Sequence, residues 1–256
     1  MANTKHLLLV LALAVSACAG NQNELKTTQV QIAEEAVPVV EEKPSDPVYD
    51  PFEGFNRRVY KFNYYVDQYV LLPVTNRYEE IAPGPVKTGV SNFLSNLGEI
   101  PTFINSTLQV KPRTAGSTLG RFAVNSTFGI LGIFDVASKI GLEKHKEDFG
   151  QTLAYYGVSE GPYLILPVLG PSNLRDFAGF SADGYMFNEV DPLNFDDHKA
   201  REYAYFGLKA VDTRSKVPVG YFGSGSPFEY ELLRRYYTDS RRIKSGSFKA
   251  DKFGNR

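Results

Sequence analysis

The sequence predicts a mainly α-helical chain that folds as a single domain. Apolar residues recur at spacings of three and four in several segments, which is the period of an amphipathic helix. Proline and glycine punctuate these segments, and proline often stands where a helix could begin. Alternating polar and apolar residues, which would predict strands, are nearly absent. The 256 residues, 43% hydrophobic and 22% charged, suffice for one such domain.

The first helix is predicted to begin at Asp50-Pro51-Phe52-Glu53. Asp50 can cap it, Pro51 suits its first position, and Glu53 can return a hydrogen bond to the cap. One helical stripe is apolar: Phe52, Phe55, Val59, Phe62, Val66 and Tyr69. The opposite side carries polar residues: Arg57, Arg58, Asn63 and Asp67. Pro73 should end the helix.

The helical pattern returns in shorter segments. Helices are predicted after Pro85, after Pro112, over 148–156 with Gly157 at its end, over 197–213, and from Ser226-Pro227-Phe228-Glu229. Residues 163–169 could be extended, although Pro167 argues against a central strand.

Residues 1–17 have the parts of a secretory signal peptide. Lys5 gives a positive start, and Leu7–Val15 is an apolar run too short to span a bilayer. Val15-Ser16-Ala17-Cys18 resembles the bacterial lipobox, whose cysteine is acylated and begins the mature protein. Ala19, and not Asp, follows, which favours transfer to the outer membrane. We therefore expect lipid attachment at Cys18; an ordinary signal peptide that contains a cysteine is the alternative.

The two ends of the chain differ in composition from its body. Residues 18–48 are acidic and lack aromatic side chains, which predicts a disordered tether before a domain over 49–238. The chain is basic from Arg234 to Arg256, and we expect a flexible tail over 239–256. The alternative is a basic arm that lies on anionic lipid headgroups.

No segment of the body is long enough and apolar enough to span a bilayer. Any contact of the body with a membrane should therefore be in-plane, through short amphipathic helices. The net charge of -1 gives no field that would recruit nucleic acid.

One motif raises the possibility of a hydrolase. Residues 157–161 fit G-x-S-x-G around Ser159, and Asp191 and His198 follow in the order of an α/β-hydrolase. That motif requires a strand-to-helix turn in a strand-rich sheet, whereas Pro162 follows here at once and few strands surround it. An esterase is therefore an alternative only. No spacing of His, Cys or acidic residues predicts a metal site, and no cofactor is expected.

Two long strings of residues resemble the MlaA family, also called VacJ. The first is Asp50-Pro51-Phe52-Glu53-Gly54-Phe55-Asn56-Arg57, followed by Val59-Tyr60-Lys61-Phe62-Asn63. The second begins Phe149-Gly150-Gln151-Thr152-Leu153-Ala154-Tyr155-Tyr156-Gly157-Val158 and continues through Gly161-Pro162-Tyr163-Leu164, Gly170-Pro171-Ser172 and Leu174-Arg175-Asp176. The resemblance covers about residues 48–215, and the stretch after Val217 does not share it.

The resemblance implies a helical ring that lies in the plane of the outer membrane around a central amphipathic pore. It implies a lipid-anchored, periplasm-facing protein of a double-membraned bacterium that removes misplaced phospholipid from the outer leaflet. Its expected partners are a trimeric porin and a periplasmic lipid carrier, and no catalytic residue is implied. We place the pore or gate at Phe62, Asn63, Tyr64, Gly129 and Gly132. A lipid-anchored tether without transport activity is the main alternative.

Overall fold

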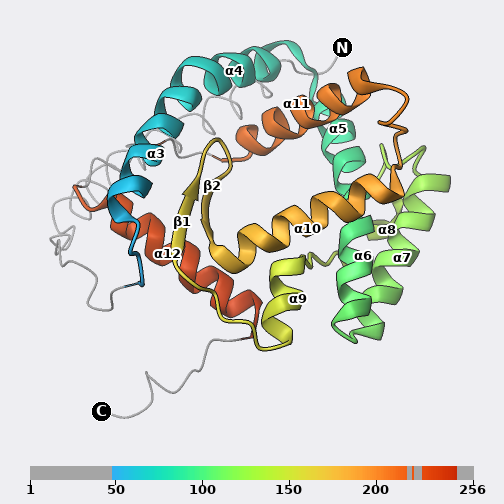
Figure 1. Cartoon of the computed structure of the whole chain (residues 1–256). Helices are drawn as coiled ribbons and strands as arrows, with labels where there is room; N and C mark the ends of the chain where they lie inside the picture. The colour runs from blue at the N-terminus through green and yellow to red at the C-terminus, as the bar shows by residue number, and fades with distance from the viewer. Residues whose placement is uncertain (1–47, 218–220, 222–226, 247–256) are drawn as a thin grey trace, which may run out of the picture. The chain divides into compact units, whose positions relative to one another are not determined.

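The computed structural model describes residues 48–217, 221 and 227–246. Every described residue belongs to the unit formed by residues 44–256. The signal peptide, Cys18 and nearly all of the tether therefore lie outside the described residues. The mainly α fold class is confirmed, since the described residues form helices and one two-stranded sheet (Figure 1).

The elements carry the labels of Figure 1. They are α3 (Glu53–Val66), η1 (Asp67–Leu71), α4 (Leu72–Ile81), α5 (Gly84–Leu97), α6 (Glu99–Leu108), α7 (Pro112–Thr127), α8 (Val136–Lys139), α9 (Phe149–Tyr155), β1 (Tyr163–Leu166), β2 (Gly170–Asn173), α10 (Leu174–Val190), α11 (Lys199–Ser215) and α12 (Glu229–Lys244). Within the described ranges, none of the helices combines the length and the apolar character needed to cross a membrane.

The expectation that Pro73 ends the first helix is wrong. The path from Glu53 to Ile81 stays helical, because a π-helical turn, η1, ends at Leu71, two residues before the proline. Proline has no N–H to donate, and its ring crowds the carbonyl group four residues earlier. In the wider turn the N–H of Leu72 donates to the carbonyl of Asp67, five residues back, which opens the path where the ring needs space.

The expected cap at Asp50 is also wrong. Phe52 stands at the N-cap of α3, and no side chain caps the helix. The Asp50 carboxylate instead accepts hydrogen bonds from Asn56 Nδ2 at 2.8 Å, the Tyr230 hydroxyl at 2.5 Å and Arg234 Nη1 at 2.9 Å. Donors from the last helix, one of them charged, have replaced the local backbone N–H groups as its partners.

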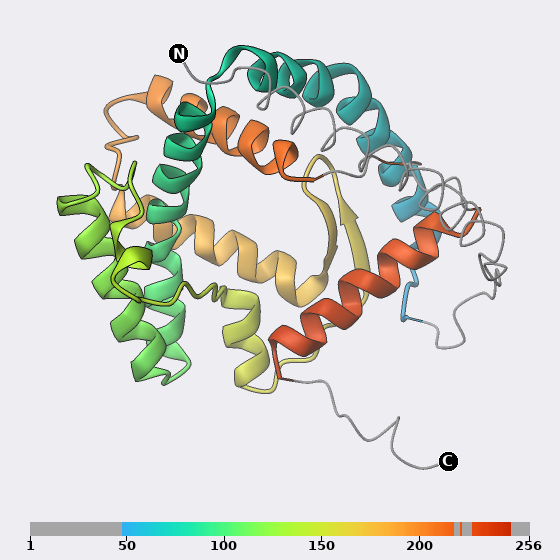
Figure 2. The same cartoon turned by 180° about the vertical axis from the view of Figure 1, so that it is seen from behind.

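Contacts between elements close a circuit within the described region. α3 packs on β1, β2 on α10, α10 on α6, and α6 on α5. α11 then joins α5 to α4, which continues α3 through η1. The remaining helices pack around this circuit: α7 on α5 and α6, α8 on α7, α9 on α6 and α10, and α12 on β2 (Figures 1 and 2).

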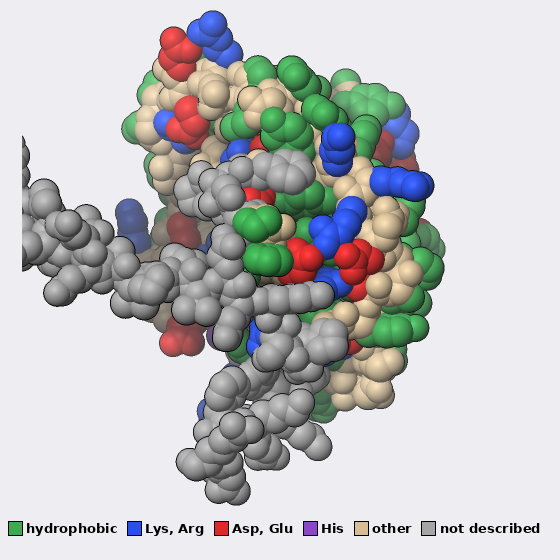
Figure 3. Space-filling view, turned by 90° about the vertical axis from the view of Figure 1, so that its left-hand side faces the viewer, with side chains coloured by type: hydrophobic (Ala, Val, Ile, Leu, Met, Phe, Trp, Pro, Cys, Tyr) green, Lys and Arg blue, Asp and Glu red, His purple; other side chains and the backbone are tan. Residues whose placement is uncertain are grey.

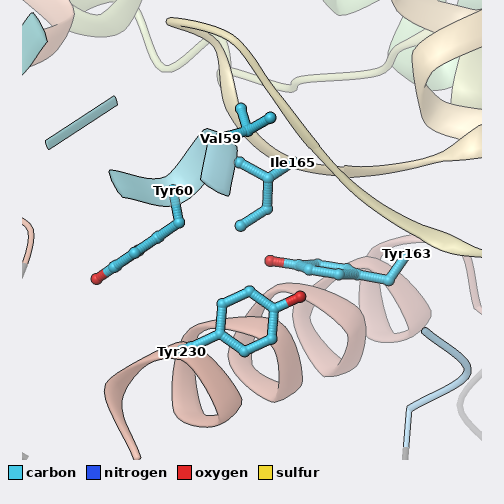
Figure 4. Packing of buried hydrophobic residues seen from close by; sticks show 5 residues of the cluster. All are labelled: Val59, Tyr60, Tyr163, Ile165 and Tyr230. Atoms are coloured by element: carbon cyan, nitrogen blue, oxygen red, sulfur yellow. The ribbon is translucent and has the colours of Figure 1, made fainter. Parts of the chain in front are cut away.

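The extended segment predicted within 163–169 is confirmed as β1, and Pro167 lies in the turn that follows it. β1 and β2 are antiparallel, with Tyr163 opposite Asn173 and Leu166 opposite Gly170. A small core lies between α3, β1 and α12 and contains Val59, Tyr60, Tyr163, Ile165 and Tyr230 (Figure 4). A second core joins α5 to α10 and α11 through Leu94, Leu97, Phe187, Phe195 and Tyr205.

The predicted tail boundary at residue 238 falls inside α12, which continues to Lys244. Arg241 bridges Asp148 at 2.6 Å and Asp176 at 2.7 Å, and Arg242 pairs with Glu160 at 2.5 Å. Carboxylates of the domain bind these two arginines, so this part of the predicted tail is neither flexible nor free to lie on lipid headgroups as a basic arm. Residues 247–256 of the expected tail lie outside the described residues.

The π turn directs Asp67 into the interior, where it is only 3% exposed. There its carboxylate accepts hydrogen bonds from Arg214 of α11, from Nε at 2.5 Å and from Nη2 at 3.1 Å. This ion pair joins the first helical path to α11 and so closes one side of the circuit.

Asp67→Ala should lower the free energy of unfolding by about 3 kcal/mol, because Arg214 would keep a mostly buried charge without its partner. Glu80→Ala is the matched control, since it breaks an exposed ion pair with Arg77 on the same helical path. Its effect should stay below about 0.5 kcal/mol. Unfolding in detergent, followed by circular dichroism, measures both variants, and equal effects would contradict a structural role for Asp67.

Candidate functional site

Polar side chains fill much of the interior of the described region. They include Asn56, Asn63, Asp67, Glu99, Asn105, Arg121, Gln151 and Asp176, all buried. Large apolar side chains are exposed on nearly every helix, among them Phe52, Phe55, Phe62, Tyr69, Phe128, Phe180, Tyr203 and Tyr236. Figure 3 shows such apolar side chains around a compact group of charged ones on the face that carries α3 and α12. So many buried polar side chains, together with so many large apolar ones exposed, are unusual for a protein surrounded by water.

α3 shows both features within one helix. The apolar stripe predicted from the spacing is present, but only Val59 of its members is buried. Phe62 is 51% exposed, whereas its neighbour Asn63 is 2% exposed. Of the polar side predicted for this helix, Asn63 and Asp67 are buried, whereas Arg57 and Arg58 are exposed. Asn56, which the prediction did not include, joins Asn63 and Asp67 in a buried polar stripe, and most of the aromatic stripe faces outward.

Two side-chain amides on this polar stripe bind β1 and the turn after it. Asn56 Nδ2 donates to the carbonyl of Tyr163 at 3.0 Å, and its Oδ1 accepts from the N–H of Ile165 at 2.9 Å. Asn63 repeats the pattern farther along the chain. Its Nδ2 donates to the carbonyl of Leu166 at 2.9 Å, and its Oδ1 accepts from the N–H of Val168 at 2.7 Å. Each amide supplies the donor and the acceptor that a neighbouring strand would otherwise provide.

Asn63 binds the turn at residues 167–169, whose backbone conformation is unfavourable for the residues that form it. Val168 has a φ of 66°, in the left-handed region that β-branched residues rarely occupy. Val168 and Leu169 are both exposed, and the turn lies beside the C-terminal end of α11 in both cartoons (Figures 1 and 2). Strained backbone of this kind persists only where surrounding contacts fix it, and such sites are often functional.

The residues expected to form a pore or gate lie on two separate elements. On α3, Phe62 is exposed, Asn63 binds the hairpin turn, and Tyr64 contacts Tyr65 with ring centroids 5.2 Å apart. Gly129 and Gly132 lie in the turn that follows α7.

Both glycines lie in closely packed backbone, where a larger side chain would not fit, and neither borders open space. A Cβ at Gly129 would lie 2.2 Å from the carbonyl oxygen of Phe134. Gly132 has a φ of +91°, and a Cβ there would lie 2.4 Å from that of Asn96. Between them, Ile130 and Leu131 are exposed and also left-handed, which the spacing of the sequence did not indicate.

The geometry of the esterase alternative is absent. Ser159 lies in the loop between α9 and β1, so its motif runs from helix to strand and not from strand to helix. Asp191 follows α10 and accepts a hydrogen bond from the N–H of Phe195, while His198 precedes α11. No hydrogen bond joins Ser159 to either residue in the part of the chain that the structure describes. No cluster of His, Cys, Asp and Glu suited to a metal ion occurs among those residues.

Two buried charge networks were not found from the sequence. The Arg121 guanidinium donates to Glu99 and Asp135, while Asn125 binds both Asp135 and the N–H of Ala137. Burial would raise the pKa of Asp135, but hydrogen bonds, first from Ser138 and then from Asn125 and Arg121, lower it to about 2. Arg241 makes the second network. The partners are distant in sequence, so no local spacing predicts these pairs.

The described region is thus a helical domain that buries many hydrogen-bonded polar side chains and exposes many large apolar ones, a surface suited to contact with lipid or with another protein. The model of one family, described as MlaA lipoprotein, matches residues 48–244. The chain belongs to this family, and the resemblance predicted for about residues 48–215 extends through α12.

Relatives and a solved structure agree with this assignment. The chain is 40% identical over 140 residues to the intermembrane phospholipid transport system lipoprotein MlaA of Escherichia coli, covering 53% of this chain and 56% of the relative. It is 32% identical over 215 residues to the protein of the same name from Haemophilus influenzae, covering 81% and 76%. An uncharacterized Rickettsia typhi protein is 38% identical over 170 residues, or 66% of each chain. The match thus spans just under two thirds of the Rickettsia protein's length and little more than half of the Escherichia coli protein's.

A solved structure concerned with the maintenance of bacterial outer membrane lipid asymmetry is also similar. Its TM-score is 0.64 at 30% identity, and the match covers 77% of this chain and 98% of that one. At this identity and coverage the similarity extends to most of the domain.

The two amides of α3 should protect different backbone groups. Asn63→Ala should speed hydrogen exchange at the N–H of Val168 by about fivefold, since a typical hydrogen bond contributes about 1 kcal/mol. The N–H of Ile165 should change little. Asn56→Ala is the matched control and should show the reverse. Residue-resolved hydrogen exchange measures both groups, and uniform loosening of the hairpin in either variant would contradict separate clamps.

Proposed function

We propose that this chain is an outer-membrane lipoprotein that removes misplaced phospholipid from the outer leaflet and passes it to a periplasmic carrier. One observation carries the proposal: the elements form a closed circuit of contacts that exposes many large apolar side chains and buries many polar ones. Such a circuit can lie among acyl chains, and a polar path through it would serve a headgroup, which cannot enter hydrocarbon without a large desolvation cost. The names of the Escherichia coli and Haemophilus influenzae relatives support the same role.

The proposed position is in the plane of the membrane, as a ring around a pore. The exposed aromatic residues of α3 and η1 support it, because rings such as those of Tyr65 and Tyr69 suit the depth of lipid headgroups. Acylation at Cys18 would anchor the chain, and two acyl chains suffice for stable attachment. A trimeric porin as neighbour and a periplasmic lipid carrier as acceptor complete the proposal, both from the family resemblance.

The proposed gate centres on Asn63 and the turn that it holds. Phe62 would contact lipid from the outer side of α3. Tyr64 would pack beside it on the same helix, against Tyr65. Gly129 and Gly132 would shape the second, tightly packed turn, where Ile130 and Leu131 are exposed. No catalytic step is proposed, and transport needs none.

The decisive experiment removes the gene and measures phospholipid in the outer leaflet. An outer-membrane acyltransferase that acts only on surface-exposed phospholipid reports the amount through its product. Deletion should raise the product, and the wild-type gene should restore it. Ser159→Ala should restore it within about twofold, since loss of a true nucleophile costs several orders of magnitude. Cys18→Ser should fail to restore it and should lose labelling by a fatty-acid analogue. Unchanged lipid asymmetry in the deletion strain would favour the tether.

Deletion of Phe62-Asn63 tests the gate. Removing two residues turns the downstream helix by about 200° relative to the upstream part. Asn56 would still hold β1, whereas the turn at Val168 would lose its amide. The rotation would also turn Asp67 away from Arg214, so we expect a protein that is less stable than the wild type but still folds in the membrane. That protein should disturb lipid asymmetry even beside a wild-type copy. Immunoblots monitor its level, and a variant that is merely degraded, with a recessive effect, would contradict the gate.

A further inference from the structure

Glu99 of α6 carries a carboxyl group that the domain hides almost completely from solvent. Only 2% of the residue is exposed, and its one donor among the described residues is Arg121 of α7, whose Nε lies 2.9 Å from Oε1. The other oxygen, Oε2, is buried and has no hydrogen-bond partner in the described part of the chain. An ionised carboxylate offers about four lone-pair sites, so these surroundings satisfy little of what the charged form requires.

Arg121 has no further donor to offer to Oε2. Its guanidinium has five N–H groups, and the one on Nε is bound to Glu99. Nη1 donates to the Ser138 hydroxyl at 3.0 Å and to the carbonyl of Leu142 at 2.8 Å. Nη2 donates to both carboxylate oxygens of Asp135 at 3.1 Å. The single positive charge of Arg121 is therefore shared by two carboxyl groups.

Asp135 is the one of the two that is better suited to a negative charge. Besides Arg121, it accepts from Asn125 Nδ2 at 3.1 Å, from the N–H of Ser138 at 3.1 Å and from the Ser138 hydroxyl at 2.6 Å. Its side chain is 28% exposed, whereas that of Glu99 is 2% exposed. Hydrogen bonds to a carboxylate favour the ionised form, and burial without them favours the neutral acid. A proton on Glu99 would leave one anion and one cation in this network.

The other helices packed on α6 bring no further cation to Glu99. α9 has no charged residue, and Lys87, the one charged residue of α5, pairs with a carboxylate of α4. Arg175, the one cation of α10, pairs with the carboxylate next to it in the sequence. α10 also presents Asp183 to α6, where it accepts from Asn105 Nδ2 at 2.7 Å, and this group adds no positive charge.

Charged groups of α7 and of the segment around α8 complete the surroundings. Arg113, the other cation of α7, is exposed and stands more than two turns before Arg121. Asp135 opposes the ionisation of Glu99, and Lys144, which is exposed, favours it. The first turn of a helix also favours an anion, but no backbone N–H of the described residues donates to the Glu99 side chain. Burial, the strongest of these influences, raises the pKa of Glu99 above its usual value.

We propose that Glu99 holds a proton on Oε2 in the folded protein, and that loss of this proton to water loosens the turn between α7 and α8. Asn125 connects the two places. Its Nδ2 binds Asp135, and its carbonyl accepts from the N–H of Gly132 at 2.8 Å. With Glu99 ionised, two anions would compete for Arg121 and repel each other, which weakens the hold on Asp135. The proton site depends on these contacts alone, whereas an effect on lipid movement rests on the proposed function, in which this turn shapes the gate.

Stability should fall as Glu99 loses its proton. Because the folded protein binds this proton more tightly than the unfolded chain does, the stability that Glu99 contributes is fully present at acid pH. It is lost as the pH rises through the pKa that Glu99 has in the folded protein. The turn at Gly132 should therefore be held most tightly in mildly acidic solution.

Infrared spectroscopy of the full-length protein in detergent detects the proton directly, since an acid and a carboxylate absorb at different frequencies. Wild-type protein should show an acid band at about pH 6, where a glutamate in water is almost entirely ionised. Glu99→Gln, which imitates the neutral acid, should reduce this band. Glu147→Gln is the matched control and should not, because Glu147 has its own cation, Lys111, at 2.8 Å. ¹³C labelling of glutamate should shift the band in wild-type protein, a check that needs no variant. A band that neither Glu99→Gln nor the label changes would overturn the proton site.

Hydrogen exchange in the same detergent measures the effect on the turn. Between about pH 5 and pH 8, protection of the Gly132 N–H, relative to the intrinsic rate at each pH, should fall about tenfold in wild-type protein, the effect of a pKa raised by one. It should stay constant in Glu99→Gln, and Asp135→Asn should lower it at both pH values. The N–H of Ile165, in the hairpin, is the internal control and should not respond. Constant protection of Gly132 in wild-type protein would overturn the link to the turn. Neither experiment uses lipid, so their failure leaves the proposed function standing, and unchanged lipid asymmetry in the deletion strain would leave the proton site standing.

Discussion

The domain depends on the pairing of polar groups that its elements hide from solvent. β1 has β2 on one edge, and on the other α3 provides the missing donors and acceptors through Asn56 and Asn63. An unpaired strand edge is a liability in water, and in hydrocarbon each unsatisfied backbone group costs several kcal/mol. A helix that carries amides two turns apart meets this requirement without a third strand. The hairpin can therefore stand beside α3 as part of the circuit.

The same requirement explains why so much of the interior is charged or polar. In the proposed position among acyl chains, apolar side chains gain little by leaving the surface, so the hydrophobic effect would select them only weakly for the interior. Hydrogen bonds and ion pairs must then specify which helix meets which. Arg121 joins α7 to α6 and to the segment before α8, and Arg241 joins α12 to α9 and α10. Each guanidinium is shared by two carboxylates, so one residue positions three parts of the chain.

The sequence predicted most of the helices but not the direction in which they face. Spacing shows that Phe52 to Tyr69 share a stripe, yet periodicity alone does not say whether a stripe is buried. Predictions from neighbouring residues failed where side chains distant in the sequence bind the same polar group. Asp50 was expected to cap α3, but Tyr230 and Arg234 bind it instead. Pro73 was expected to end a helix, but the π turn at Asp67, held by Arg214, lets the path continue. The spacing of residues did not predict the members of the site, which came from the family resemblance. The role of Asn63 became clear only from its hydrogen bonds to the hairpin.

The bonds of Asp50 to α12 also set an order of events during synthesis. Tyr230 and Arg234 come 180 and 184 residues after Asp50. The Asp50 carboxylate can therefore form these hydrogen bonds only after nearly the whole chain has been synthesised. Contacts of such long range close late and slowly. Until then the first helix keeps polar groups unpaired and aromatic residues bare, in a state prone to aggregation. A chain built in this way needs protection until its last helix is in place, and truncation at the C-terminus would leave Asp50 without two of its hydrogen-bond donors.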